Sequence, residues 1–254
     1  VFLTRFKNPK YKIKIGLVGK YVELQDSYKS ILESLIHAGA ENETEVQVIS
    51  LHSEHLNKEN IQESLKFIDG LIVAPGFGER GIEGKITAIK YARENKIPFF
   101  GICLGMQMAV IEYARNQVGL FDANSTEMLP NCKIPVIDLM ESQKKINKKG
   151  GTMRLGAWDC DLIENTHAAD AYSIKSISER HRHRYEFNND YLDKIFDESF
   201  IVAGTNPDTG LVEIIEYKNH PWFVGVQFHP EYKSTVSTPH PLFKSFVKAS
   251  LAKK

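Results

Sequence analysis

Short apolar runs and amphipathic stretches alternate over roughly the first 120 residues, and this alternation limits the possible folds more than any other feature. The run 70–74 (GLIVA) has the length of a buried strand, and 83–94 has the period of a helix. Such alternation indicates βαβ units, which build a parallel sheet with helices on both faces. Asp26 is a candidate helix cap, and Gly39 a candidate helix stop. We expect strands near 11–18, 45–51, 70–74 and 98–102, and helices near 26–38, 57–67, 83–94 and 104–116.

The second half of the chain has a different pattern. Its apolar segments are joined by turns rich in Gly, Asn, Asp and Pro, which is typical of strands that pair through short connections. We expect strands near 152–158, 200–205, 211–217 and 222–228, and a closing helix near 241–251. The whole pattern predicts an α/β fold of three layers, in which a central, mostly parallel mixed sheet lies between helices.

The composition excludes several classes of function. The formal net charge is zero, so the chain sets up no field that would gather nucleic acid or an anionic membrane. Its apolar runs are shorter than the ~18 residues that a membrane span needs. Three cysteines far apart, Cys103, Cys132 and Cys160, argue against a disulfide framework and favour a reducing compartment. We therefore expect a cytoplasmic protein with no nucleic-acid or membrane partner.

The segment GICLG (101–105) places Cys103 between two glycines, where a predicted strand turns into a predicted helix. Small flanking residues allow a tight strand-to-helix turn that exposes one side chain above the sheet edge. The unpaired amides at the helix start favour a thiolate, the reactive form of cysteine. The amide of Leu104 would also point toward an oxyanion that forms there. A buried cysteine beside a packing turn is the alternative.

Two further segments can complete such a site. His229-Pro230-Glu231 follows a predicted strand, and residues two apart in an extended segment share a face, so Glu231 can orient the imidazole as a base. The loop 75–78 (PGFG) follows another strand, at the sheet edge where ligands bind, and can bring a second amide to the oxyanion. Each segment alone has a plain alternative, a solvated strand end or an ordinary turn. Together with Cys103 they predict acyl transfer from a carboxamide or ester.

The segments GICLGMQ (101–107) and VGVQFHPE (224–231) resemble those of the class I glutamine amidotransferases, whose triad is cysteine, histidine and glutamate. Within that family the chain is similar to the glutaminase domains of CTP synthases, from IGLVGKY (15–21) to the last helix. The resemblance implies the class I glutamine amidotransferase fold. The segments that carry this closer similarity are GGTMRLG (150–156), SERHRHRYE (178–186), LVEIIE (211–216) and NHPWF (219–223).

The resemblance implies a role for individual residues. Cys103 corresponds to the nucleophile, His229 to the acid and base, and Glu231 to the carboxylate that orients the histidine. The amides of Gly76 and Leu104 correspond to the oxyanion hole. In place of the family's usual P-G-G-F-G loop, this chain has Pro75 before Gly76-Phe77-Gly78, and proline stiffens the approach to the loop. The residues that the resemblance assigns to glutamine binding are Gln107, Glu127, Arg184, Phe77 and Tyr185.

The chemistry of glutamine agrees with this set. Free glutamine carries a carboxylate and an ammonium group on its α-carbon, so its site needs one arginine and one carboxylate. The residues alone do not separate Arg184 from Arg180 and Arg182, and an exposed basic loop that binds RNA is the alternative for HRHR, which the zero net charge disfavours. His181 and His183 are spaced for a metal only if other ligands converge, so we expect no metal site.

The resemblance also implies what lies outside this chain. In CTP synthases a synthetase domain uses ATP, Mg²⁺ and UTP and receives the ammonia, and GTP acts as an activator through the region of Arg154. The chain has no G-x-x-x-x-G-K-[ST] loop. We therefore expect a glutamine amidotransferase domain at 11–254, the end of an interdomain linker at 1–10, and no cofactor in this domain. The synthetase domain would be the covalent partner, in a homotetramer.

Two alternatives remain open from the sequence. The first is another enzyme of the same class, such as a glutaminase that serves GMP synthesis or a γ-glutamyl hydrolase. The segments HRHRYE and GGTMRLG argue against it. The second is a regulatory module that keeps the fold and has little turnover in isolation, although all three residues of the expected triad are present.

Overall fold

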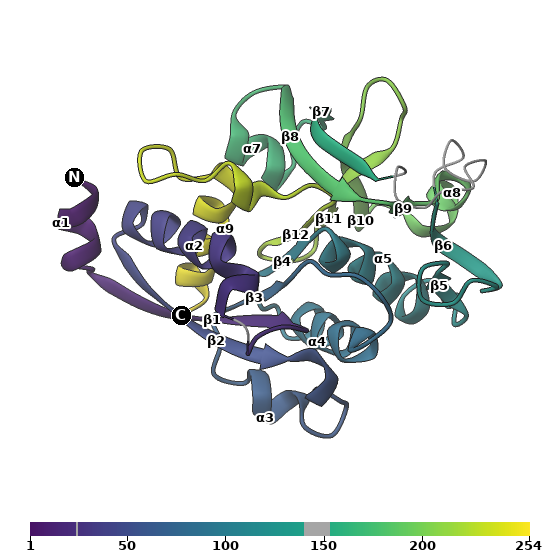
Figure 1. The fold of residues 1–254 in the computed structure, drawn as a ribbon, viewed down its shortest axis with the longest axis horizontal. Helices are drawn as coiled ribbons and strands as arrows, with labels where there is room; N and C mark the ends of the chain where they lie inside the picture. Colours follow the sequence, from purple (N-terminus) through teal and green to yellow (C-terminus); the bar gives the residue numbers. More distant parts are fainter. Residues whose placement is uncertain (24, 140–152) are drawn as a thin grey trace.

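A computed structural model describes residues 1–23, 25–139 and 153–254. Within these residues the chain folds around a nine-stranded sheet in the order β2-β1-β3-β4-β12-β11-β10-β7-β8 (Figure 1). The first five strands in this order pair in parallel and the remaining pairs are antiparallel, so the expected mixed sheet is confirmed. The parallel part comprises β2 (Thr44–His52), β1 (Tyr11–Gly19), β3 (Gly70–Val73), β4 (Phe99–Ile102) and β12 (Phe223–Val226).

Helices cover both faces of this sheet, and each face has its own apolar core. One core contains buried residues of α4 and α5, such as Ile86 and Val110, against the sheet. The other contains residues of α2 and α9, such as Leu35 and Phe246. The expected three layers are therefore present (Figure 1). The helices are α1 (Phe2–Lys7), α2 (Lys29–Glu41), α3 (Ile61–Leu65), α4 (Ile82–Glu94), α5 (Leu104–Asn116), α7 (His167–Tyr172), α8 (Leu192–Ile195) and α9 (Pro241–Lys253).

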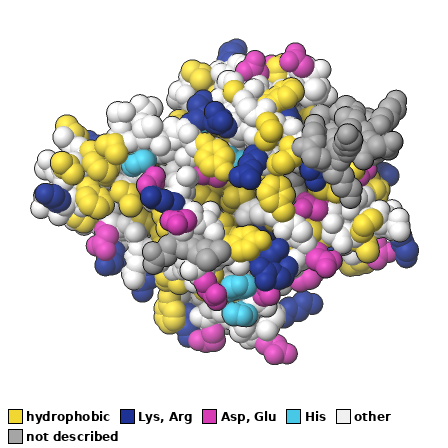
Figure 2. All heavy atoms as spheres, in the orientation of Figure 1, with side chains coloured by type: hydrophobic (Ala, Val, Ile, Leu, Met, Phe, Trp, Pro, Cys, Tyr) yellow, Lys and Arg dark blue, Asp and Glu magenta, His cyan; other side chains and the backbone are white. Residues whose placement is uncertain are grey.

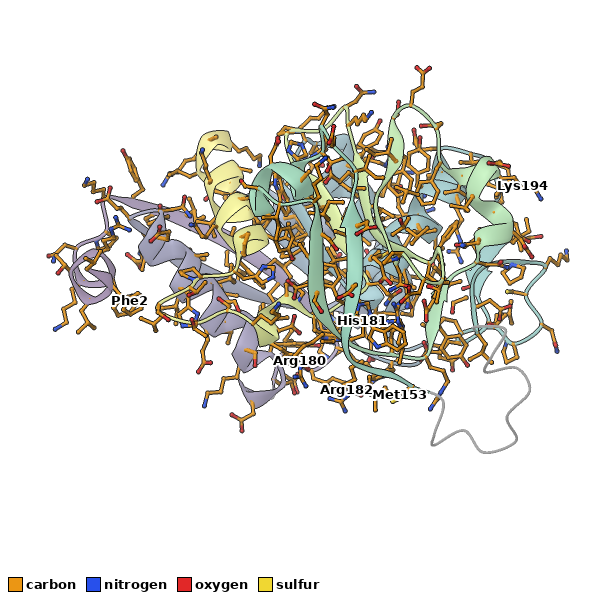
Figure 3. The ribbon with its side chains drawn as sticks, turned by 90° about the horizontal axis from the view of Figure 1, so that it is seen from above. Phe2, Met153, Arg180, His181, Arg182 and Lys194 are labelled. Carbon is orange, nitrogen blue, oxygen red and sulfur yellow. The ribbon has the colours of Figure 1, made fainter. Side chains whose placement is uncertain are left out.

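The antiparallel part contains a strand that the sequence interpretation missed. Residues 181–183 of the HRHR segment do not form an exposed loop but lie in β8, which pairs with β7, and Arg184 follows the end of that strand. Burial alternates along it, so His181 and His183 face the interior while Arg180 and Arg182 lie outside (Figure 3). The strands of this part are β7 (Arg154–Leu162), β8 (Ser176–His183), β10 (Phe200–Thr205) and β11 (Val212–Tyr217); a separate small sheet contains β5 (Ala123–Ser125), β6 (Ile134–Leu139) and β9 (Tyr185–Phe187).

Two predicted helices have different boundaries from those expected. Tyr28, not Asp26, is the N-cap of α2, because residues 25–28 form a 3₁₀ turn. Gly39 does not stop α2, which continues to Glu41. The glycine instead allows α2 to approach the start of β2, because a side chain there would lie 2.7 Å from the carbonyl oxygen of Thr44. The helix expected at 57–67 is only the short α3. Residues 150–152 of the GGTMRLG segment lie outside the described residues.

Charged side chains of both signs are dispersed over the face seen in Figure 2, among hydrophobic ones. This agrees with a formal net charge of zero. Among the described residues, no helix combines the length and apolar character that a membrane crossing requires.

Gly105 provides a test of how closely α5 approaches the sheet. A Cβ atom on Gly105 would lie 2.2 Å from the carbonyl oxygen of Val73, so either α5 or β3 has to move. We expect Gly105→Ala to lower the free energy of unfolding by about 3 kcal/mol, measured by chemical denaturation. Gly119 has a φ of +82° and nothing within 4 Å of an added Cβ, so the control Gly119→Ala should cost only about 1 kcal/mol. Equal losses would contradict the close approach.

Candidate active site

Three loops meet at the carboxyl edge of the parallel strands. β4 lies between β3 and β12, with Val73 paired to Gly101 and Val226 paired to Ile102. Because parallel strands end at the same edge, the residues that follow them become neighbours. The structure thereby brings together the three segments that the sequence singled out, which follow β3, β4 and β12.

Cys103 lies at the joint between β4 and α5. Its φ of 52° and ψ of −103° are unusual for a residue with a side chain, as expected of a tight nucleophile turn. Its N–H donates to the carbonyl of Val226 at 2.7 Å, which holds the turn against β12. The first bond within α5 runs from the N–H of Gln107 to the carbonyl of Cys103. The amide of Leu104 precedes that bond, so it has no partner within the helix.

His229 and Glu231 form a buried pair after β12. The Nδ1 atom of His229 lies 2.8 Å from Oε1 of Glu231. The pairing that the sequence suggested is present, but not through an extended segment: residues 230–232 form a 3₁₀ turn after Pro230. The ring of Tyr232 stacks on the imidazole at 5.0 Å.

The electrostatics of His229 favour its charged form. Burial lowers the pKa of His229, but the charge of Cys103 and the hydrogen bond to Glu231 outweigh burial and raise this pKa well above its usual value. Among the described residues its Nε2 atom, which is buried, has no hydrogen-bond partner. The charges of Cys103 and Glu231 therefore favour the imidazolium form of His229.

The loop after β3 is fixed at one peptide group. The N–H of Gly78 donates to Oε1 of Glu127 at 2.8 Å, and the carbonyl of Phe77 accepts from Nζ of Lys20 at 3.2 Å. The N–H group and the carbonyl oxygen of the Phe77–Gly78 peptide are thus both hydrogen-bonded. A Cβ added to Gly76 would lie 3.5 Å from Cδ2 of Leu104, which places the two candidate oxyanion residues side by side.

The five residues assigned to glutamine binding by resemblance come together beside this loop. Burial raises the pKa of Glu127 overall, whereas the charge of Arg184 acts on Glu127 to lower it. The charges of Glu127 and Arg184 also act on Tyr185. The amide of Gln107 donates to the carbonyl of Tyr185 at 2.8 Å. Phe77, in the loop itself, is 45% exposed.

Comparisons with known proteins identify the family of this chain. A family model described as "Glutamine amidotransferase class-I" matches residues 23–249. The glutaminase domain of Trypanosoma brucei CTPS, solved with bound acivicin, is 36% identical and has a TM-score of 0.89, with 95% of each chain covered. The chain belongs to the class I glutamine amidotransferases, among the CTP synthase glutaminase domains. A glutamine amidotransferase from Methylobacillus flagellatus, 12% identical with a TM-score of 0.54 over 97% of this chain and 94% of its own, shares the fold.

Longer relatives show the context of this amidotransferase domain. The CTP synthase of Flavobacterium johnsoniae is 65% identical over 98% of this chain, and that of Clostridium acetobutylicum is 59% identical over 94%. The chain spans about half the length of these relatives, 47% and 45% respectively.

Sequence reasoning missed Lys85, which the structure buries beside the loop after β3. Its Nζ donates to the carbonyl of Ala74 at 2.9 Å and would lie 3.7 Å from a Cβ on Gly76. Burial lowers the pKa of Lys85 to about 7, although the charge of Cys103 raises it. A lysine among Ile82, Ile86 and other apolar residues of α4 was the available signal, because a cation on a buried helix face needs a specific partner.

A cluster of buried polar side chains lies where β7, β8 and β11 come together. The guanidinium of Arg154 lies 2.6 Å from Oε1 of Glu213 and 3.4 Å from Oε2 of Glu186. Burial raises the pKa of Glu186 to about 8 and that of Glu213 to about 7, and it lowers the pKa of His183 to about 3. His181 is 2.8 Å from His183, and neither histidine lies in a cluster suited to a metal: among the described residues no group of three or more His, Cys, Asp or Glu could hold one.

Glu231→Gln tests the pairing with His229. The substitution keeps the shape but removes the carboxylate charge, so the pKa of His229 falls and its tautomer is no longer fixed. We expect the rate of glutamine hydrolysis to fall roughly 10²–10⁴-fold, measured as glutamate released. Glu59→Gln, at an exposed position, is the matched control. Equal rates for the two variants would contradict the role of Glu231.

Lys85→Met tests the cost of burying Lys85. The folded pKa of Lys85, about 7, is below the ordinary lysine pKa of 10.5. The unfolded chain therefore binds more protons between these two pH values, and the buried lysine destabilises the fold most at low pH. We expect Lys85→Met to have a higher free energy of unfolding than wild type. This gain should be larger at about pH 7 than at about pH 9.5, by on the order of 2 kcal/mol. Chemical denaturation measures this. The half-exposed Lys90→Met, also in α4, should show no such dependence.

Proposed function

We propose that this domain hydrolyses L-glutamine to glutamate and ammonia through Cys103, His229 and Glu231. One observation carries the proposal: a cysteine at a strained strand-to-helix turn that shares a buried site with a histidine paired to a carboxylate at 2.8 Å. A cysteine held as a thiolate beside an imidazolium is the activated nucleophile of amide-cleaving enzymes. The family membership supports the same reaction class.

The first half of the reaction forms a thioester. The thiolate of Cys103 attacks the side-chain carbonyl carbon of glutamine, and the carbonyl oxygen becomes an oxyanion. The amides of Leu104 and Gly76 are the candidate donors for that charge, and one such donor is worth about 3 kcal/mol in comparable sites. His229 gives its proton to the leaving nitrogen, the carbon–nitrogen bond breaks, and ammonia departs.

The second half releases glutamate. His229, now neutral, takes a proton from a water molecule as the water attacks the thioester carbon. The carbon–sulfur bond then breaks, and glutamate leaves while Cys103 returns to the thiolate. Glu231 stays ionised throughout and holds the imidazole in one tautomer through its Nδ1.

Recognition of free glutamine needs opposite charges at its two α-substituents. Arg184 is the proposed partner of the α-carboxylate and Glu127 that of the α-ammonium, and their electrostatic coupling supports placing both at one site. Phe77, Tyr185 and Gln107 are proposed to line the same site. The bond between Glu127 and Gly78 ties substrate recognition to the oxyanion loop.

We further propose that the ammonia serves the amination of UTP to CTP in the complete protein. The relatives are CTP synthases about twice as long as this chain, which supports a covalent synthetase domain that uses ATP, Mg²⁺ and UTP. Residues 1–10 would end the linker to it, and the complete enzyme would be a homotetramer. We place it in the cytoplasm, in keeping with three free cysteines among the described residues.

GTP is proposed as an activator of the complete enzyme near Arg154. The guanidinium of Arg154 is itself buried against Glu213 and Glu186, so it does not fit a direct contact with a triphosphate in this structure. An effector would have to act through neighbouring residues. No step of the hydrolysis proposed above depends on GTP.

Labelling with an electrophilic glutamine analogue tests the proposed function. We expect acivicin to add one molecule to the wild-type chain, because Cys103 would attack it at the glutamine site, and intact-mass measurement detects the adduct. The adduct should be absent in Cys103→Ser and much reduced in Arg184→Ala, whose matched control is Arg182→Ala on the outer face of β8. No adduct, or one on Cys132 or Cys160, would contradict the proposal.

A further inference from the structure

A row of side-chain amides leads from the backbone of Tyr185 to the sulfur of Cys103. The Nε2 atom of Gln107 lies 2.8 Å from the carbonyl oxygen of Tyr185 and 3.2 Å from Oε1 of Gln227. The Nε2 atom of Gln227 in turn lies 3.7 Å from the sulfur of Cys103. The row begins at the segment that holds Arg184 and ends at the reacting atom.

The direction of this row is fixed at its start. A backbone carbonyl can only accept, so Gln107 has to present its NH₂ group to Tyr185. The second hydrogen of that NH₂ group points to Gln227, which therefore accepts this hydrogen bond through its side-chain oxygen. Gln227 therefore presents its own NH₂ group to the sulfur of Cys103, and the opposite orientation would place two donors and two acceptors against each other.

Burial makes this orientation hard to reverse. Gln227 is fully buried and Gln107 is 3% exposed, so water does not compete for these groups. The backbone also holds Gln227, whose N–H donates to the carbonyl of Glu213 at 2.9 Å. A buried N–H donor aimed at sulfur stabilises a thiolate more than a thiol, since hydrogen bonds to a charged acceptor are the stronger ones.

We propose that Gln227 is a further catalytic residue, which donates a hydrogen bond to the thiolate of Cys103, and that Gln107 is a positioning residue that fixes the amide of Gln227. The inference rests on the proposed function for its use in glutamine hydrolysis. Two basic groups are coupled by charge to Cys103: His229, after β12, and Lys85, in α4. Gln227 adds a neutral hydrogen-bond donor to these two groups.

The consequence for mechanism is a nucleophile held from more than one direction. His229 must change its protonation state during the reaction, whereas the amide of Gln227 cannot lose its proton at ordinary pH. Gln227 would therefore stabilise the thiolate both before attack and when the thioester breaks. In the thioester the sulfur is neutral, so the same hydrogen bond favours the return of Cys103 as leaving group.

The test is alkylation of Cys103 by iodoacetamide, a reagent that needs no glutamine site. The rate is measured against pH for Gln227→Met, which keeps the length but lacks the donor, with the reaction at Cys103 followed by peptide mass. We expect the pH midpoint of alkylation to rise by about one unit in Gln227→Met. It should rise further in Gln227→Glu, where a carboxylate oxygen would face the thiolate. Gln117→Met, at the exposed end of α5, is the matched control and should follow wild type.

Wild-type midpoints in both folded Gln227 variants would overturn the proposal. If circular dichroism shows that these variants do not fold, Gln107→Met decides, because it frees the amide of Gln227 to turn. A smaller rise in the pH midpoint then supports the proposal, and a wild-type midpoint overturns it.

Acivicin labelling separates the two proposals. Shifted alkylation without any acivicin adduct on wild type would support Gln227 and contradict the glutamine site, and the reverse result would do the opposite.

Discussion

The active-site arrangement depends on the close contact of α5 with the end of β3. Gly105 lies so near the carbonyl of Val73 that no side chain fits between them. This contact lets the chain turn sharply after β4, and Cys103 takes up the strained φ of 52° that the turn requires. The helix amides, the thiol and the loop after β3 therefore come together at one point. Without that approach, the residues after the three parallel strands would share an edge but not a site.

The candidate active site places two basic side chains, His229 and Lys85, near the thiol of Cys103 within an apolar surrounding. Burial alone would neutralise His229 and Lys85, and it succeeds in part for Lys85, whose pKa falls to about 7. For His229 the charges of Cys103 and Glu231 prevail. The difference follows from partners: the histidine has a carboxylate at 2.8 Å, whereas the lysine donates to a neutral carbonyl of Ala74.

Much of the fold, and the three segments that meet at the candidate site, could be predicted from local patterns. The turn at Cys103 has small residues on both sides, and the alternation of strands and helices identified the parallel half of the sheet. The sequence did not reveal β8, because its interior positions carry His181 and His183 rather than apolar residues. These two histidines are hydrogen-bonded to each other, and His183 is also bonded to the carbonyl of Tyr185. Lys85 and Gln227 were missed for the same reason: a buried polar residue is explained by its partners, which are distant in sequence.

The alternation along β8 has a consequence for how the strand tolerates length changes. Its outward residues include Arg180 and Arg182, and its inward ones include His181 and His183, with a period of two. A single inserted or deleted residue would turn every side chain beyond it to the opposite face, so guanidinium groups would enter the space beside Arg154. Half of this strand is exposed, yet it should accept replacements on its outer face far more readily than any change in its number of residues.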